Sequence, residues 1–145
     1  MLAVVFPRLY GLQDRYLDSD AERLALFLSY AGEKAASSRT YYRVGFDLHG
    51  ARIGIEISPD GKEFAPSTDP AIRAFNLKDG VDIGEVSAPG LGKVTRGQAS
   101  ILMAPTGAPF FEVALVSGGR RTIVTYNPYT GRAAVSKGHD DAAKR

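Results

Sequence analysis

The sequence contains no cysteine, only two histidines and only a short apolar run at its start. The lack of cysteine excludes disulfide bonds, thiolate catalysis and cysteine metal sites. The opening run, residues 2–6, is far shorter than the about 20 apolar residues that a membrane-spanning helix needs. An excess of one charge is also lacking. The 18 basic and 16 acidic residues leave a net charge of +2, which by itself indicates neither a nucleic-acid partner nor a membrane-surface partner.

The opening run does not form a complete signal peptide. Arg8 follows the run instead of preceding it, and no small-residue cleavage site comes after it. The run is therefore either part of a longer segment or an ordinary buried segment. The length of 145 residues and the hydrophobic content of 44% favour one globular domain with one core.

Residues 17–36 carry the period of an amphipathic helix, and this is the most strongly patterned part of the chain. Apolar residues recur at steps of three and four, namely Leu17, Ala21, Leu24, Leu28, Ala31 and Ala35. Ser19 and Glu22 have the spacing of a capping box, so the helix either begins there or passes through. Ser37 and Ser38 mark its end.

Leu26 and Tyr30 fall nearly opposite this apolar stripe, so we expect both outside the contact with the sheet. A single exposed leucine is normal on a protein surface. An exposed apolar side chain on a helix that continues toward an apolar segment is also what a bundle of such helices would use. The sequence leaves both interpretations open.

The rest of the chain has the period of strands and the composition of turns. Residues 41–57 alternate in two runs around His49-Gly50, which predicts a hairpin, and Ser58 to Lys62 predicts a turn. Residues 63–97 are expected to be an irregular connection with one or two short strands. Four apolar runs follow, QASILMAP, PFFEVALV, RRTIVTY and GRAAVS, and predict an antiparallel meander.

One helix followed only by strands predicts an α+β domain, with a long N-terminal α-helix packed on antiparallel β-sheet. The expected organisation after residue 16 is a globular domain at 17–136 and a frayed tail at 137–145.

No residue pattern predicts a catalytic, cofactor or metal site. Asp47 and His49 could offer two metal ligands, but a solvated turn histidine is the better interpretation. His139, in the tail, is followed by two aspartates that lack supporting neighbours. GLGKVT fails as a phosphate loop because Ser87 replaces the first glycine and Val94 replaces the Ser or Thr. We therefore do not expect an enzyme.

Basic residues gather near the C-terminus, and we single out Arg120, Arg121 and Arg132, with Tyr126 and Tyr129 between them. Cations interleaved with aromatic rings can bind and stack on a nucleic-acid strand. The alternative is a charged hairpin, because strand edges commonly carry such residues against edge-to-edge pairing.

Two segments together resemble the type IV pilin-like proteins. LAVVFPRLYG, followed by AERLALFLSYAGEKAASSRTYYRVGFDL, is similar to an apolar helix end, a proline and an amphipathic continuation before the first strand. IRAFNLKDGVDI, ILMAPTGAPFFEVAL and YNPYTGR extend the likeness to the minor pseudopilins of the H type in type II secretion. Related minor pilins of type IV pilus biogenesis are similar too.

The resemblance implies a structural subunit near the tip of a periplasmic filament. Its partners would be other minor pseudopilins and the major pseudopilin, and the inner membrane would hold it through its N-terminal helix. Leu2, Val4, Val5, Phe6 and Pro7, with Leu26 and Tyr30, would belong to the assembly and membrane helix, with Pro7 as a kink. The alternative is a minor pilin that binds DNA for uptake through Arg120, Arg121 and Arg132.

The sequence departs from this family at its start. Family members begin with a short basic leader, a glycine at the processing site, a phenylalanine and a buried glutamate, and none of these is present here. The resemblance implies that residues 1–16 are the remnant of the N-terminal membrane and assembly helix, with the apolar residues 2–6 corresponding to the last part of its membrane segment. The calcium loop of the major pseudopilins is not apparent, so no metal is expected.

Overall fold

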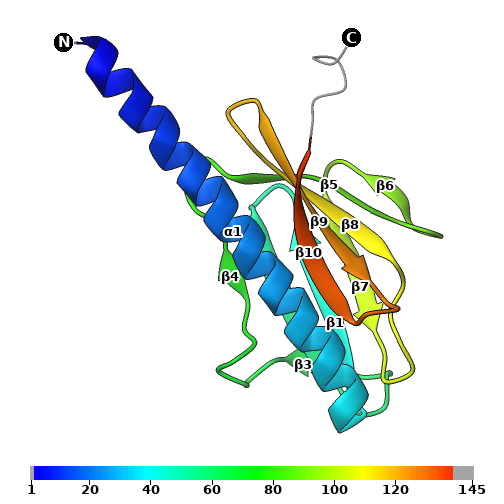
Figure 1. The fold of residues 1–145 in the computed structure, drawn as a ribbon. Helices are drawn as coiled ribbons and strands as arrows, with labels where there is room; N and C mark the ends of the chain where they lie inside the picture. The colour runs from blue at the N-terminus through cyan, green and yellow to red at the C-terminus, as the bar shows by residue number, and fades with distance from the viewer. Residues whose placement is uncertain (1, 139–145) are drawn as a thin grey trace.

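The computed structural model describes the backbone of residues 2–138 and the side-chain surroundings of residues 15–137. One long helix, α1 (Leu2–Ser38), is followed by the strands β1 to β10. The C-terminal part of α1 lies against the strands, and its N-terminal part extends beyond them (Figure 1). The predicted α+β class, a long helix packed on antiparallel sheet, is confirmed.

Helix α1 is longer than the predicted residues 17–36, since it runs from Leu2 to Ser38. It passes through Ser19 and Glu22, so no capping box begins a helix there. At its end Arg39 adopts a positive φ of 54°, and the amide of Thr40 donates to the carbonyl of Ala35 at 3.2 Å. A left-handed residue after the last turn is a common helix stop.

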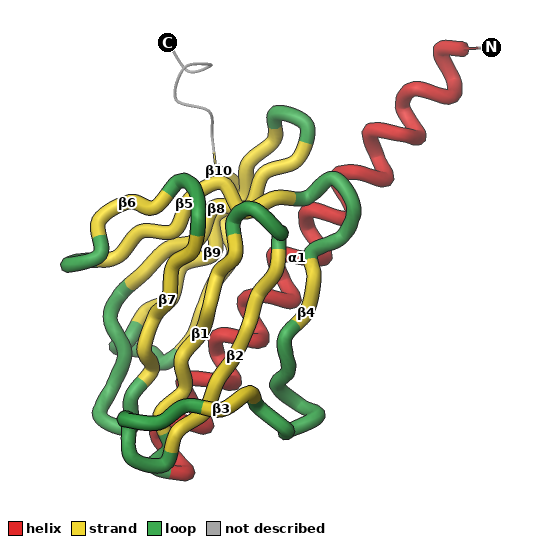
Figure 2. Tube along the Cα trace, turned by 180° about the vertical axis from the view of Figure 1, so that it is seen from behind, coloured by secondary structure: helices red, strands yellow, loops and turns green. Residues whose placement is uncertain are grey.

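The first sheet contains β1 (Tyr41–Asp47), β2 (Arg52–Ser58) and β7 (Gln98–Met103), with the short strands β3 (Ala65–Pro66) and β4 (Phe75–Asn76) on β2. The predicted hairpin is confirmed, with Val44 opposite Ile55. Its turn is closed by Asp47, whose carboxylate Oδ1 accepts the amides of His49 and Gly50 at 3.1 and 3.0 Å. Figure 2 shows this sheet from behind.

The second sheet has the order β10-β9-β8-β5-β6. Its strands are β5 (Asp82–Ala88), β6 (Gly92–Val94), β8 (Phe111–Ser117), β9 (Arg120–Asn127) and β10 (Arg132–Gly138). The segment that superficially resembled a phosphate loop is the hairpin between β5 and β6, with Gly90 and Gly92 at positive φ.

The predicted four-stranded meander is wrong for its first strand. β7 does not pair with β8 but with β1 of the other sheet, with Ile101 opposite Val44. The alternating burial of β7 is compatible with pairing to β1 or to β8. Residues 104–110, between β7 and β8, cross from one sheet to the other. The remaining three strands, β8 to β10, are consecutive neighbours as predicted.

β10 includes Lys137 and Gly138, the first two residues of the expected tail, paired with Thr122 and Arg121. Residues 139–145, with His139, lie outside the described residues. The described strand therefore continues two residues past the expected end of the globular domain at residue 136.

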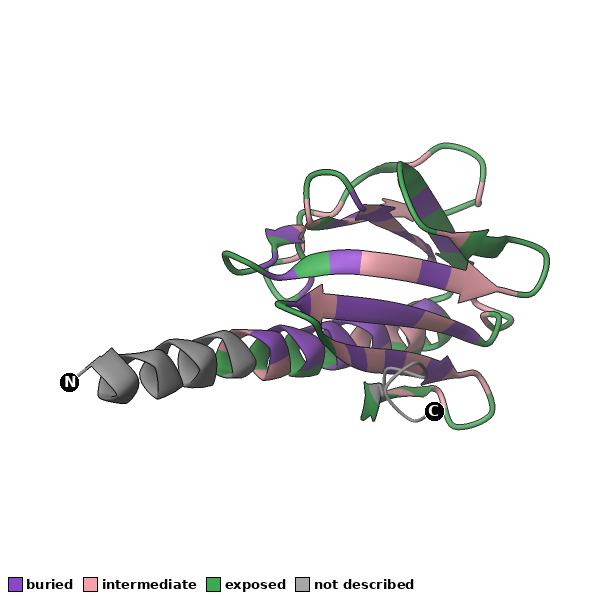
Figure 3. Cartoon of the chain, turned by 90° about the horizontal axis from the view of Figure 1, so that it is seen from above, coloured by how far each residue is buried: buried purple, intermediate pink, exposed green. Residues whose placement is uncertain are grey.

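The core lies where α1 and the two sheets meet (Figure 3). Phe46 of β1 meets Phe111 of β8 edge to face, at 6.5 Å between ring centroids, and so joins the sheets. Phe111 also stacks on Tyr126 of β9 at 5.4 Å. Helix α1 packs mainly on β9 and β10. Its buried residues include the whole predicted stripe, Leu17, Ala21, Leu24, Leu28, Ala31 and Ala35, together with Ala25 and Phe27.

The connection after β2 is irregular, as expected, but it is firmly attached to the core. The connection contributes three buried side chains to the core, those of Ile72, Phe75 and Leu77. The carboxylate Oδ2 of Asp20, a fully buried residue of α1, accepts the amide of Lys78 at 2.7 Å. Because an unmade hydrogen bond at a buried group costs free energy, this contact fixes the connection against the helix.

Candidate assembly surface on the exposed face of α1

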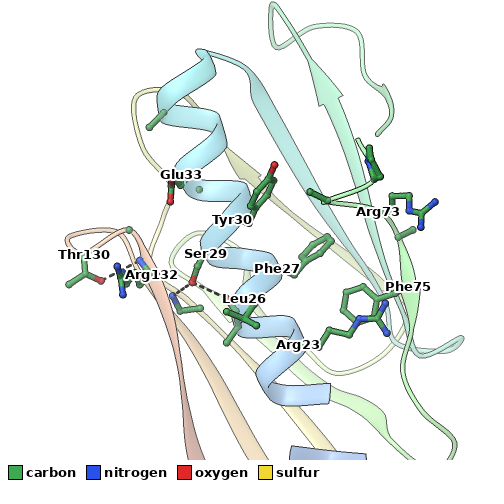
Figure 4. Close-up of a pocket in the computed structure, with 18 residues that line it drawn as sticks. Arg23, Leu26, Phe27, Ser29, Tyr30, Glu33, Arg73, Phe75, Thr130 and Arg132 are labelled. Carbon is green, nitrogen blue, oxygen red and sulfur yellow. Dashed lines mark hydrogen bonds between the residues drawn. The ribbon is translucent and has the colours of Figure 1, made fainter. Parts of the chain in front are cut away.

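The face of α1 that points away from the sheets carries the most exposed large apolar side chain of the helix within the described part of the chain. Leu26 is 73% exposed, as the helical period predicts. Its neighbours along the same face are Arg23, Tyr30 and Glu33, at steps of three and four residues (Figure 4). Residues at this spacing form one line along a helix.

This face forms the floor of an open groove of ≈ 1140 Å³. One wall is made by the connection, with Arg73 and Phe75, and the other by the start of β10 and the turn before it, with Thr130 and Arg132 (Figure 4). The groove is therefore assembled from three segments that are far apart in the sequence.

The wall formed by the connection is held to the helix by aromatic contacts. Phe27 meets Phe75 edge to face at 5.3 Å between ring centroids. The guanidinium carbon of Arg23 lies 4.1 Å from the centre of the Phe75 ring, on the groove side. A cation over an aromatic face contributes about 0.5–1 kcal/mol at exposed sites, so Arg23 is oriented by this contact.

Tyr30 lies half-buried between the helix and the connection, and its hydroxyl donates to Oδ2 of Asp69 at 3.2 Å. Partial desolvation raises the pKa of Tyr30, and the hydrogen bond to the Asp69 carboxylate and the charge of that carboxylate raise it further. Tyr30 therefore remains a neutral donor, and it contributes an aromatic edge rather than a charge to the groove.

Ser29 of the helix helps to hold the wall formed by β10. The hydroxyl of Ser29 donates to the carbonyl of Ala25 and accepts the amide of Ala133, both at 2.8 Å. The sequence pattern gave no signal for this contact. The Ser29 hydroxyl thereby satisfies the backbone amide of Ala133 on the outer edge of β10. Figure 4 shows the hydrogen bonds of Ser29 as dashed lines.

The predicted assembly residues at the start of α1 are Leu2, Val4, Val5, Phe6 and Pro7. Their backbone is helical, and the helix continues through Pro7, but their side chains lie outside the described surroundings. Within the described residues, no helix combines the length and the apolar character that crossing a bilayer requires.

The basic residues near the C-terminus are not brought together. Arg121 is paired with Gly138 and Arg132 with Asn127, at opposite ends of the β9-β10 hairpin. The two arginines are therefore separated by about 20 Å along the strands. Arg121 Nη2 also lies 3.7 Å from Oε1 of Glu85, and Arg120 stands beside it at the start of β9.

Tyr126, expected to stack on bases, is only 3% exposed and belongs to the core, where burial raises its pKa. Tyr129 is 95% exposed at the tip of the hairpin. Of the residues predicted to contact nucleic acid, Arg132 lines the groove, whereas Arg120, Arg121, Tyr126 and Tyr129 do not.

The other candidate ligands have structural roles in the described part of the chain. Asp47 closes the hairpin turn beside His49, and among residues 2–138 no group of three or more His, Asp or Glu side chains could hold a metal ion. Sequence reasoning missed Asp20. Its one signal was a carboxylate at a position that the helical period assigns to the buried stripe.

No protein-family model matches the chain, and no curated protein sequence matches it. Solved structures do. Two structures of the minor pseudopilin EpsH from the type II secretion system of Vibrio cholerae are each 15% identical in sequence, with TM-scores of 0.65 and 0.68. They match 86% and 90% of this chain, and 98% and 99% of their own.

The type IV minor pilin FimU of Pseudomonas aeruginosa is 18% identical, with a TM-score of 0.56, over 85% of this chain and 90% of that one. All three solved structures match over most of their own length and over the helix-and-sheet arrangement described above. The chain therefore has the type IV pilin-like fold of minor pseudopilins and minor pilins.

Proposed function

We propose that this chain is a minor pseudopilin of the H type, a structural and non-enzymatic subunit of the pseudopilus of a type II secretion system. The observation that carries the proposal is the division of α1. Its 37 residues form one helix, and within residues 15–38, where the structure describes side-chain surroundings, the buried stripe runs from Leu17 to Ala35. The N-terminal part of α1 extends beyond the sheets, and the folded domain packs on the C-terminal part of the same helix (Figure 1). The pilin-like fold supports the same role.

In this proposal residues 1–16 belong to the helix that first holds the subunit in the inner membrane and later packs into the filament. Leu2, Val4, Val5 and Phe6 supply the apolar surface, and the globular domain lies in the periplasm. The partners are other minor pseudopilins and the major pseudopilin near the filament tip. Leu26 and Tyr30 add a second contact surface on the exposed face of the same helix.

A minor pilin that binds DNA for uptake is the weaker candidate. It requires Arg120, Arg121 and Arg132 to act as one surface, whereas the hairpin register places Arg132 at the opposite end of the hairpin from the other two. Tyr126, which was to stack on bases, is buried. The resemblance of the fold to a type IV minor pilin keeps a pilus role, without DNA, as the competing assignment to be tested.

The test is complementation of a deletion strain of the source bacterium by the full-length chain. We expect the deletion to reduce export of a folded protein into the medium, and the chain to fractionate with the inner membrane. Val5→Asp should fail to complement, because a charge in the apolar segment is costly in lipid and in a packed bundle. The matched control is Thr95→Asp at an exposed position, which should complement.

Normal export in the deletion strain, together with a chain recovered in the soluble periplasmic fraction, would contradict the proposal. Loss of surface pili with normal export would assign the subunit to a type IV pilus instead.

A further inference from the structure

Three arginines from three different segments line the groove over the exposed face of α1. Arg23 comes from the helix, Arg73 from the connection and Arg132 from the start of β10 (Figure 4). The only acidic residue among the described lining residues is Glu33. The groove is therefore basic, although the chain as a whole is nearly neutral with its net charge of +2.

These three cations form no ion pair with any carboxylate in the described part of the chain. Arg43, Arg121 and Lys137 do have such partners, Glu56, Glu85 and Asp18. Arg23 instead lies over the Phe75 ring. Asp69, which directly precedes the wall residues 70–75 on the connection, accepts a hydrogen bond from the hydroxyl of Tyr30. Among the described lining residues, three positive charges therefore stand against the single negative charge of Glu33, around an exposed leucine.

The shape of the groove fits a rod. Its floor is the line from Arg23 through Leu26 and Tyr30 to Glu33, about 15 Å long at the rise of an α-helix. Walls stand on both sides, at residues 70–75 and 130–133. Two helices that pack side by side lie about 8–10 Å apart, and their contacts recur every three or four residues, as on this floor.

We propose that the groove binds an acidic amphipathic helix of a neighbouring filament subunit. An apolar side chain of that helix covers Leu26, and its flanking carboxylates face Arg23, Arg73 and Arg132. The inference rests on the proposed function, because it takes the neighbour to be another pilin-like subunit. It adds the chemistry of the partner, which complementary charge makes specific.

A nucleic-acid strand fits the same groove less well. Phosphates would be attracted by the arginines, but they would leave Leu26, 73% exposed, against a charged backbone. In the wall, the Phe75 ring is already in contact with the Arg23 guanidinium and with the edge of Phe27, so it is not free to stack on a base. The groove has an apolar centre and a cationic rim. This combination matches a helix that carries an apolar stripe flanked by acidic residues.

The test uses site-specific photocrosslinking in cells that produce the other pilin-like subunits of the source bacterium. The full-length chain carries p-benzoylphenylalanine at Leu26 or, in a second strain, at Val5. We expect Leu26 to crosslink to a helical peptide of another subunit in which Asp and Glu outnumber Lys and Arg.

The charge is tested by reversal. Arg23→Glu, Arg73→Glu and Arg132→Glu together should lower the crosslink yield at Leu26 at least about tenfold, whereas the three changes to Lys should keep it within about twofold. The matched control, Lys62→Glu, Lys93→Glu and Arg96→Glu, changes the net charge equally but lies outside the groove lining, and should leave the yield unchanged.

The outcomes separate this inference from the proposed function. Crosslinks at Val5 without any at Leu26 would leave the filament role standing and overturn the groove proposal. Absence of crosslinks at both positions would remove support from the filament role as well. A nuclease-sensitive adduct at Leu26, a basic or non-helical partner peptide, or a yield unaffected by charge reversal would each overturn the acidic-helix proposal.

Discussion

Tyr30 links the helix to the connection through one hydrogen bond, and its ionisation reports on that contact. Desolvation and the Asp69 carboxylate raise its pKa, so the neutral phenol is favoured in the folded state. We expect the tyrosinate of Tyr30 to form at higher pH than in a free tyrosine. The stability from this contact is then present at neutral pH and is lost as the pH rises through the raised pKa.

The measurement is the difference in tyrosinate absorbance between the wild type and Tyr30→Phe during alkaline titration. Asp69→Asn should move the Tyr30 transition back toward lower pH, because it removes the negative charge. A Tyr30 transition at the ordinary tyrosine pKa would contradict the assignment.

Gly32 is required where the helix meets β9. A Cβ added at this position would collide with the hydroxyl of Tyr126. We expect Gly32→Ala to lower the free energy of unfolding by about 1–3 kcal/mol from this overpacking, partly offset by the better helix propensity of alanine. Urea denaturation measures the change.

Two comparisons test the cause. In a Tyr126→Phe background the cost of Gly32→Ala should fall, because the colliding hydroxyl is gone. Gly45→Ala, where a Cβ meets no atom within 4 Å, is the control and should cost less than Gly32→Ala. An equal cost at both glycines would show that the collision is relieved without loss.

At the scale of the elements, Asp20 fastens the connection to α1. Its Oδ2 accepts the Lys78 amide at 2.7 Å, while its buried Oδ1 has no partner among the described residues. Asp20→Ala should lower the free energy of unfolding by about 1–3 kcal/mol, because the amide of Lys78 loses its partner. Amide hydrogen exchange should speed up locally at Lys78.

Asp18→Ala is the matched control on the same helix. Asp18 is paired with Lys137 at 3.5 Å, but both side chains are largely exposed. An exposed pair of this kind contributes about 0–1 kcal/mol, so this variant should remain close to wild type. A larger loss for Asp18→Ala than for Asp20→Ala would contradict the role given to Asp20.

Local patterns predicted the elements better than their pairing. The period of three and four residues identified the buried stripe of α1, and alternation identified the β1-β2 hairpin with its short turn. Alternation also identified β7, but it carries no information about which neighbour a strand joins. The pairing of β7 with β1 depends on contacts across more than 50 residues, so the expected meander was wrong there.

At the scale of the whole molecule, we expect the buried face of α1 to determine stability and, in the proposed function, the exposed face to contribute to assembly. Leu28 is fully buried, and Leu26, two residues earlier, is 73% exposed. Leu28→Ala should lower the free energy of unfolding by about 2–5 kcal/mol, whereas Leu26→Ala should change it by no more than about 0.5 kcal/mol. Thermal or urea unfolding of the isolated chain measures both.

For Leu26 we expect a functional effect without an effect on stability. Leu26→Ala should reduce complementation of the deletion strain although the protein remains folded, because Leu26 lies at the centre of the groove floor. Full complementation by this variant would show that the exposed leucine contributes nothing to assembly.

The candidate surface was predictable only in part. The helical period placed Leu26 outside, but Arg73 and Arg132 reach the groove from segments that only the fold brings next to the helix. Conversely, Arg120, Arg121 and Arg132 are near one another in sequence, and the hairpin register places Arg132 at the opposite end. Sequence proximity is a poor guide to a surface that is built from several elements.

The path of the chain between the two sheets also sets the order in which the domain can be completed. The chain builds β1 to β4 in one sheet, β5 and β6 in the other, returns for β7, and crosses again for β8 to β10. β5 therefore cannot pair with its neighbour inside the second sheet until β8 has been made. Likewise, α1 cannot pack on the strands that it mainly contacts until β9 and β10 have been made. When the chain is made from its N-terminus onward, the second sheet and the packing of α1 cannot be completed before β10, and such non-local pairing favours slow folding.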